Sequence, residues 1–288
     1  MKFTTYLRDG APRLAVADGR GLIDLHDAEP TVPADLREAL KAGVDLAAAA
    51  RSALAGAPRR LDLAKVRLAP LVPEPGKTIC LGLNYFDHAK EGGREKPDYP
   101  WFFFRGASSL IAHGDEGVVP AVSSKFDYEA ELAVVIGRKV PRHVKEADAL
   151  QYVFGYSCFN DMSVRDYQKR TPQWTIGKNF DGTGGFGPVL VTADELPPGA
   201  VGLKIQGRLN GEVMQDANTS DMIFGVAETI ALLAQVLTLE PGDVIVMGTP
   251  AGVGQARTPP VWMKAGDTYE VEIERVGLLA NPIVNEAA

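Results

Sequence analysis

Two glutamates spaced two residues apart, Glu129 and Glu131, stand at the start of an apolar run from Leu132 to Gly137. Side chains two apart on a β-strand point to the same face, so a buried strand here would bring both carboxylates into one small space. Like charges in a protein interior are costly unless a cation joins them. The pair therefore suggests a bound divalent ion, the alternative being an exposed strand edge whose acids face water.

A third carboxylate, Asp161, ends the apolar run from Tyr152 to Asn160 and could stand at the tip of a neighbouring strand. Three carboxylates with no cysteine or histidine pair nearby favour a hard ion that prefers oxygen ligands, Mg²⁺ or Mn²⁺ before Ca²⁺. The same donor set excludes a structural zinc site.

His88 and Glu91 are three residues apart in Asn84 to Glu91 and would be neighbours on one helical turn. A carboxylate beside an imidazole fixes its tautomer and raises its basicity, as a general base requires. A solvated histidine on a polar loop is the alternative. Asp87 is a rival partner, although adjacent helical residues face apart.

Two glycine-rich segments fail the tests for nucleotide-binding loops. Residues 182–187 fit G-x-G-x-x-G, but a strand-like segment follows where the dinucleotide motif needs a helix, so these glycines are expected in tight turns or beside a ligand. The segment from Gly248 to Gly254 lacks the Gly-Lys-Ser/Thr of a P-loop. Its backbone N–H groups and the Thr249 hydroxyl could instead hold a carboxylate. The chain has no G-x-S-x-G elbow, which argues against a serine hydrolase.

The chain has 288 residues, 45% hydrophobic and 23% charged, with a net charge of -7. This composition is typical of a globular protein, and the acidic balance argues against nucleic-acid binding. We expect no signal peptide and no membrane span, and two buried free thiols at Cys80 and Cys158 rather than a disulfide. A cytoplasmic protein is the resulting prediction.

The pattern along the chain predicts a small α/β domain over residues 1–70 and a β-rich domain over 71–288, separated by a proline-rich segment. The first has short strands and alanine-rich helices between Ala34 and Leu54. In the second, residues 226–236 have helical periodicity, Asn210-Gly211 predicts a type I′ hairpin, and 84–128 and 162–188 are expected as long irregular connections. The strands expected there are Thr78–Leu83, Leu132–Gly137, Val153–Asn160, Val189–Thr192, Leu203–Leu209, Glu212–Gln215, Val244–Met247 and Thr268–Val276.

In order, these segments resemble the fumarylacetoacetate hydrolase family over residues 77–284. The resemblance rests on Gly82-Leu83-Asn84-Tyr85-x-x-His88, Asp127-Tyr128-Glu129-x-Glu131, Asn160-Asp161-x-Ser163-x-Arg165-Asp166, Trp174-x-x-Gly177-Lys178, Asn210-Gly211-Glu212, Pro241-Gly242-Asp243 and Gly248-Thr249-Pro250-x-Gly252-Val253-Gly254. It implies an α+β, β-rich fold, a mixed β-sandwich roll after a small α/β domain, and a homodimer.

The resemblance also implies roles for individual residues. Glu129, Glu131 and Asp161 would bind Mg²⁺ or Mn²⁺, and His88 and Glu91 would lie on a lid over the substrate. The pocket-lining positions are Arg165, Gln168 and Lys178, with Gly248 and Thr249 at a substrate carboxylate. Residues 181–186 depart from the Asp-Thr-Phe-Pro pattern of many members, so the substrate does not transfer with the fold.

The chemistry that this set favours is hydrolysis of a carbon–carbon bond in an acylpyruvate, a small anionic 2-oxo acid, giving pyruvate and a carboxylic acid. The ion would act as a Lewis acid, His88 would activate water, and Lys178, with Gln168 as helper, would stabilise an oxyanion. Oxaloacetate decarboxylation, keto–enol isomerisation and dehydration or hydrolysis of sugar acids remain alternatives on the same site. A non-catalytic metal-binding protein is the rival from another class.

Overall fold

The computed structural model describes residues 1–56 and 59–287. Most of its strands belong to one sheet with the order β3-β2-β1-β12-β10-β9-β15-β4-β5, to which β6 adds beside β12. The bounds are β1 Lys2–Arg8, β2 Ala11–Ala17, β3 Leu22–Asp24, β4 Thr78–Gly82, β5 Trp101–Arg105, β6 Leu110–Ile111, β9 Ala130–Ile136, β10 Val153–Asp161, β12 Gly184–Thr192 and β15 Val244–Val246.

A second, five-stranded sheet has the order β14-β13-β16-β17-β7, and β8 and β11 form a small pair. Their bounds are β7 Gly117–Val119, β8 Phe126–Asp127, β11 Ser163–Val164, β13 Lys204–Leu209, β14 Glu212–Asn218, β16 Thr268–Ile273 and β17 Gly277–Asn285. The predicted hairpin is confirmed, because Leu209 pairs with Glu212 across Asn210 and Gly211, both with positive φ.

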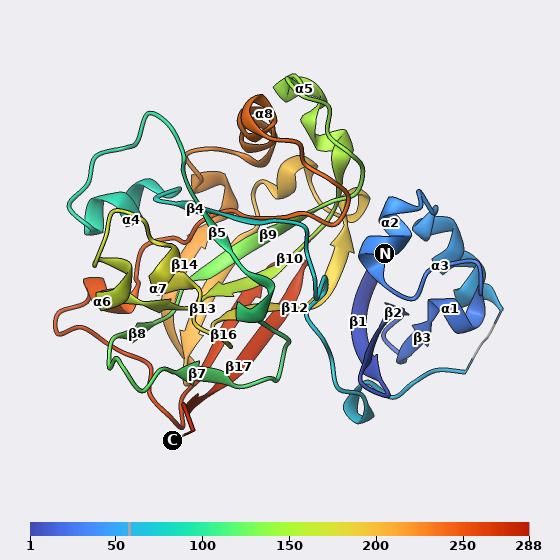
Figure 1. The fold of residues 1–288 in the computed structure, drawn as a ribbon, viewed down its shortest axis with the longest axis horizontal. Helices are drawn as coiled ribbons and strands as arrows, with labels where there is room; N and C mark the ends of the chain where they lie inside the picture. Colours follow the sequence, from blue (N-terminus) through green and yellow to red (C-terminus); the bar gives the residue numbers. More distant parts are fainter. Residues whose placement is uncertain (57–58, 288) are drawn as a thin grey trace.

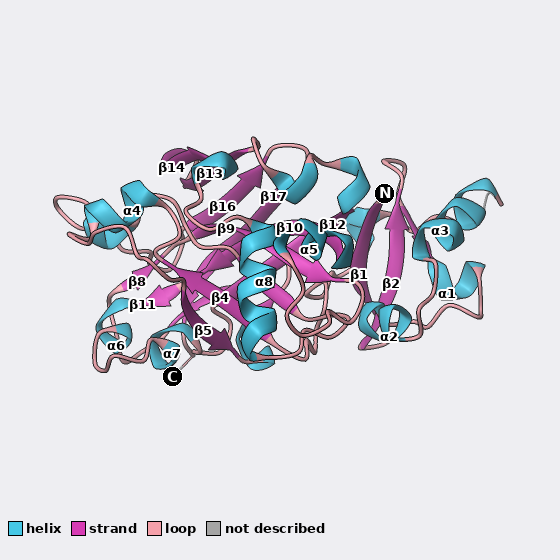
Figure 2. Cartoon of the chain, turned by 90° about the horizontal axis from the view of Figure 1, so that it is seen from above, coloured by secondary structure: helices cyan, strands magenta, loops and turns pink. Residues whose placement is uncertain are grey.

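The helices are short, and most of them surround the sheets (Figure 1). They are α1 Leu25–Ala28, α2 Leu36–Lys41, α3 Leu46–Ala55, α4 Phe86–Glu91, α5 Glu146–Ala149, α6 Arg165–Gln168, α7 Thr175–Lys178 and α8 Val226–Val236. The predicted helix over 226–236 is confirmed as α8, which runs across the molecule beside α5 (Figure 2). In the part of the chain described, no helix combines the length and apolar character needed to span a bilayer.

Strand β9 is buried on both faces, which explains its nearly continuous apolar sequence. Leu132, Val134 and Ile136 face the core that the second sheet covers. Ala133 and Val135 face a core that also contains residues of α2 and α3. Glu131 has the parity of Ala133, so its carboxylate belongs to this second face. The predicted buried strand is confirmed, and both cysteines are buried and free.

The N-terminal unit joins the large sheet through β1, whose Lys2 and Phe3 pair with Val191 and Leu190 of β12. In Figure 1 this unit, drawn in blue, lies at the opposite end of the molecule from α4 and α6. The large sheet therefore contains strands from both sides of the predicted domain boundary near residue 70. The division into two domains stays a prediction.

The expectation of irregular connections at 84–128 and 162–188 was wrong in several places. Strands β5 to β8 lie in the first segment and β11, α6, α7 and the start of β12 in the second. Of the glycine-rich residues 182–187, those from Gly184 onward belong to β12, and the turn is limited to Gly182, with φ of 69°. Short strands with glycine or charged residues inside them have weak alternation, so local pattern did not reveal them.

Candidate active site

The three predicted metal ligands meet at the ends of two paired strands. The register of β9 and β10 sets Glu131 opposite Phe159, two residues before Asp161, and Glu129 immediately precedes β9. All three side chains are buried, and one carboxylate oxygen of each lies within 4.8 Å of the others. The strand pairing thus brings together residues that stand 30 positions apart in the chain.

Three cationic side chains also enter this group. The ammonium of Lys178 donates hydrogen bonds to Glu129 and, at 2.6 Å, to Oδ2 of Asp161. Nη2 of Arg165 lies 2.7 Å from Oε1 of Glu129, and Nε of Arg105 donates to Oδ1 of Asp161. Glu129 and Asp161 are therefore each paired with two cations.

Glu131 has a different environment. No lysine or arginine in the described residues lies within 4 Å of it, and its hydrogen bond comes from the backbone N–H of Gly248, at 2.6 Å. Burial, followed by repulsion from Asp161 and Glu129, raises the pKa of Glu131 well above its usual range. For Glu129, burial acts in the same direction, but Arg165 and Lys178 outweigh it and hold the pKa below the usual value.

This arrangement fits a divalent cation. Three converging carboxylate oxygens are the donor set of a hard ion such as Mg²⁺ or Mn²⁺. Glu131 is a buried carboxylate with no lysine or arginine of the described residues within 4 Å, and a bound cation would stabilise its charged form.

Arg105, at the end of β5, is a site residue that no sequence motif predicted. Besides Asp161, its guanidinium donates to the carbonyl oxygens of Met162 at 2.6 Å and Thr183 at 2.9 Å. A Cβ atom on Gly184 would lie 3.1 Å from Nη1 of Arg105, so glycine leaves room for this side chain. The aromatic run before Arg105, residues 101–104, is the signal typical of a strand that could have indicated its position.

His88 and Glu91 lie on α4, as the three-residue spacing predicts. Nδ1 of His88 is 2.7 Å from Oε1 of Glu91, and Oε2 of Glu91 accepts a hydrogen bond from the N–H of Gly252 at 2.9 Å. The helix is also anchored through Asn84, whose side chain bonds to the backbones of Phe224 and Met247. Because Glu91 engages Nδ1, the opposite nitrogen of His88 is available for proton transfer.

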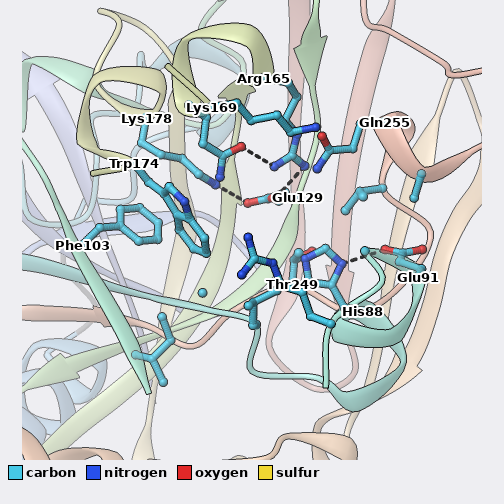
Figure 3. A pocket seen from close by; sticks show the side chains of 18 of the residues that line it. His88, Glu91, Phe103, Glu129, Arg165, Lys169, Trp174, Lys178, Thr249 and Gln255 are labelled. Carbon is cyan, nitrogen blue, oxygen red and sulfur yellow. Dashed lines mark hydrogen bonds and ion pairs between the residues drawn. The ribbon is translucent and has the colours of Figure 1, made fainter. Parts of the chain in front are cut away.

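One cavity of about 340 Å³ contains both groups. Figure 3 shows Lys178 and Arg165 pointing to Glu129 on one side and the His88–Glu91 pair on the other. The rings of Phe103 and Trp174 form an apolar wall. Glycine at position 82 leaves room for the Trp174 ring, since a Cβ atom there would lie 2.0 Å from it. The cavity is thus polar at its carboxylates and apolar along one side.

The predicted substrate-binding residues lie in or beside this cavity, and most of their polar groups form hydrogen bonds with other protein groups. Arg165 bonds to Asp127 at 2.7 Å and to Oε1 of Gln168 at 3.0 Å. The Thr249 hydroxyl donates to the Ala130 carbonyl at 3.1 Å and accepts from Gln215 at 2.7 Å. The N–H of Gly248 is already bonded to Glu131. Substrate roles for these residues stay predictions.

Three further lining residues, Arg94, Lys169 and Gln255, were not predicted. They come from three separate segments of the chain, and no motif marks them. Their relevance depends on tertiary contacts that join residues over 70 positions apart, which a local sequence pattern does not contain.

Comparison with known proteins identifies the family. Residues 77–284 match the fumarylacetoacetate hydrolase C-terminal family model. The human mitochondrial oxaloacetate tautomerase FAHD2A is 42% identical over 273 residues, covering 94% of this chain and 86% of the relative. The oxaloacetate tautomerase YisK of Bacillus subtilis is 40% identical over 93% of this chain and 94% of its own length.

A solved structure supports the fold and the interpretation of the three carboxylates as a site for a divalent metal ion. It is maleylpyruvate hydrolase from Sphingobium sp. SYK-6 in complex with manganese(II) and pyruvate, which aligns over the whole of both chains with a TM-score of 0.83 and 31% identity. The expected strand-rich α+β fold is confirmed. The chain belongs to the fumarylacetoacetate hydrolase family.

Proposed function

We propose that the protein is an enzyme, dependent on a divalent metal ion, that interconverts the keto and enol forms of oxaloacetate or a closely related 2-oxo acid. The observation that carries the proposal is the placement of the His88–Glu91 pair and the carboxylate group around one cavity. A base beside a site that stabilises an enolate is what proton transfer next to a carbonyl group requires. The two oxaloacetate tautomerases among the relatives support the choice of substrate.

Glu129, Glu131 and Asp161 would hold the ion, with Mg²⁺ or Mn²⁺ preferred to Ca²⁺. When bound, it would supply Lewis-acid chemistry, lowering the energy of negative charge on the 2-oxo oxygen. Lys178 contacts two of these ligands and would keep them ionised, because its own positive charge is fixed by the same contacts. Burial alone lowers the pKa of Lys178, but Asp161 and Glu129 outweigh burial and raise it.

His88 would move the proton. Nε2 takes a proton from C3 of the keto form, the C–H electron pair becomes the C2–C3 double bond, and the C2 oxygen takes up the negative charge. The same proton then passes from His88 to that oxygen and gives the enol. Glu91 stabilises the imidazolium formed between the two steps, and Gly252 fixes Glu91 in place.

Hydrolysis of an acylpyruvate, the reaction that the sequence motifs favour, is the second candidate. The buried Oε1 atom of Gln255, a residue that lines the cavity, has no hydrogen-bond donor among the described residues, and an attacking water that reached it would supply the missing donor. Similarity to maleylpyruvate hydrolase also favours this reaction. We rank it below tautomerisation because the two relatives named as tautomerases are more similar in sequence than this hydrolase.

Product analysis tests the ranking. Purified protein with Mg²⁺ or Mn²⁺ is given enol oxaloacetate, and the loss of enol absorbance is followed while pyruvate is assayed. Accelerated ketonisation without pyruvate supports the proposal. Pyruvate from oxaloacetate would instead show decarboxylation, and pyruvate plus an acid from an acylpyruvate would show hydrolysis.

The homodimer and the cytoplasmic location stay predictions. Size-exclusion chromatography with light scattering tests the homodimer. The human relative FAHD2A is named as mitochondrial, so the location needs its own test.

A further inference from the structure

In the part of the chain that the structure describes, two cationic side chains at the cavity lack the ionic partners that the other lysine and arginine side chains there have. Arg94 follows α4, Lys169 follows α6, and both line the cavity with exposed side chains. Within the described ranges, no carboxylate lies within 4 Å of either one, whereas Arg165 and Lys178 each contact buried carboxylates. The guanidinium of Arg94 lies 5.0 Å from the ring centre of Trp101, which orients it without neutralising it.

The two cations enter from different elements. Lys169 lies on the same side of the cavity as Arg165 in Figure 3. Burial, followed by repulsion from Arg165, lowers the pKa of Lys169. Arg94 belongs to the segment beyond the His88–Glu91 pair. Both residues line the one cavity that also contains Glu129 and Glu131, so a small ligand bound at the carboxylate group would share that cavity with these two positive charges.

The charge of the cavity matches a ligand with two negative charges. The cavity is lined by Arg94, Arg165, Lys169 and Lys178 and by Glu91, Glu129 and Glu131, and the buried ion-pair partners of this set are Asp161, Arg105 and Asp127. Five cations and five carboxylates cancel, so a bound divalent ion leaves two positive charges. A 2-oxo acid with one carboxylate would neutralise one of them, and a dicarboxylate neutralises both.

We propose that Arg94 and Lys169 form a second carboxylate site that makes the enzyme selective for 2-oxo acids carrying a distal carboxylate. The inference rests on the proposed function, which sets the 2-oxo end of the substrate at Glu129, Glu131 and Asp161. The two residues determine specificity and take no part in proton transfer.

Binding of two inert ligands tests the site without turnover. Malate and lactate share a 2-hydroxy acid end, and malate adds the distal carboxylate. With Mn²⁺-loaded protein in titration calorimetry, we expect malate to bind about tenfold more tightly than lactate, as two charge-assisted contacts would give. Replacing both residues, Arg94→Met with Lys169→Met, should bring the two affinities to within about twofold, while lactate affinity stays unchanged.

Matched controls are Lys90→Met and Arg170→Met, which remove exposed charges of neighbouring positions outside the cavity lining. Both should keep the tenfold preference. The proposal is overturned if wild-type protein binds malate no better than lactate, or if the double variant keeps the preference. Unchanged lactate affinity shows that the double variant is folded, and each single variant should lose part of the preference.

Turnover separates this inference from the proposed function. Oxaloacetate and its 4-methyl ester share the reacting atoms, and the ester lacks the distal charge. We expect the double variant to lose its preference for oxaloacetate through KM while ester turnover is retained. If neither compound is tautomerised but the malate preference depends on Arg94 and Lys169, the proposed reaction fails and the carboxylate site stands.

Discussion

Buried carboxylates occur at both ends of the molecule, with different partners. In the N-terminal unit, Asp24 accepts hydrogen bonds from the Tyr6 hydroxyl at 2.6 Å, from Nε and Nη2 of Arg13 at 2.8 Å, and from the N–H of Asp27 at 2.9 Å. Both Asp24 oxygens are thereby bonded to cations or N–H groups. Glu131 is also buried, but it receives one backbone N–H group and faces two other carboxylates.

This difference separates a structural carboxylate from one that is available to a ligand. Arg13 and Tyr6 outweigh burial and lower the pKa of Asp24, whereas burial and like charges raise that of Glu131. A carboxylate satisfied by its own unit stabilises that unit. A buried carboxylate without an ionic partner lowers stability, and it persists where it serves to bind a cation.

The largest effect is expected from Glu131→Gln. Glutamine keeps an acceptor for the Gly248 N–H but removes a metal ligand, so metal-dependent turnover should fall at least about 1000-fold. Removing a repelled charge should leave the midpoint of thermal unfolding of the metal-free protein unchanged or raised. Mn²⁺ titration and thermal melts measure the two effects. Mn²⁺ affinity equal to wild type would refute the metal assignment of Glu131.

Substitutions at the His88–Glu91 pair should come next. His88→Ala should reduce turnover about 100- to 10,000-fold by removing the base, and Glu91→Gln about tenfold by weakening its orientation. Both variants should bind Mn²⁺ and oxalate as wild type does, since neither residue belongs to the carboxylate group. Loss of oxalate binding in His88→Ala would make His88 a ligand or a structural residue.

Asp24→Asn tests the structural side of the comparison. It should reduce the free energy of unfolding by about 2 kcal/mol, because Arg13 loses its buried ionic partner. The matched control Asp27→Asn, at an exposed position of the same cluster, should cost less than about 0.5 kcal/mol. Urea unfolding gives both values. If Asp24→Asn also weakened Mn²⁺ binding, the two carboxylates would not be functionally separate.

The smallest effect is expected in the pH dependence of the stability difference between wild type and Asp24→Asn. The folded-state pKa of Asp24 lies below its ordinary value, so its stabilising contribution is present above an unfolded-state pKa of about 4 and is lost as the pH falls through the folded-state pKa. The stability gap between wild type and Asp24→Asn should therefore be constant from pH 7 to 5 and narrow below about pH 4. Thermal melts at these values check it. A gap that widened on acidification would contradict the lowered pKa.

Much of the site could be predicted because its key pairs are local. Glu129 and Glu131 share a strand face, and His88 and Glu91 share a helical turn, so spacing alone indicated their proximity. Asp161 was found because it ends a long apolar run. Arg105 was missed because its five-residue strand lies inside a segment without clear periodicity, and the glycines of β12 were read as a loop because glycine in a strand resembles a turn signal.

The sequence by itself determined the buried strands, the helix α8, the hairpin at Asn210 and Gly211, and the types of residue that meet in the cavity. These features follow from the period of the side chains along one element and from the ordered motifs of the family. Only the tertiary structure decided that Lys178, Arg165 and Arg105 neutralise Glu129 and Asp161 while Glu131 is left with a backbone N–H. It also placed Arg94 and Lys169 at the cavity with no carboxylate of the described residues within 4 Å. Charge pairing depends on distances between remote segments, and those distances exist only after the sheets have assembled.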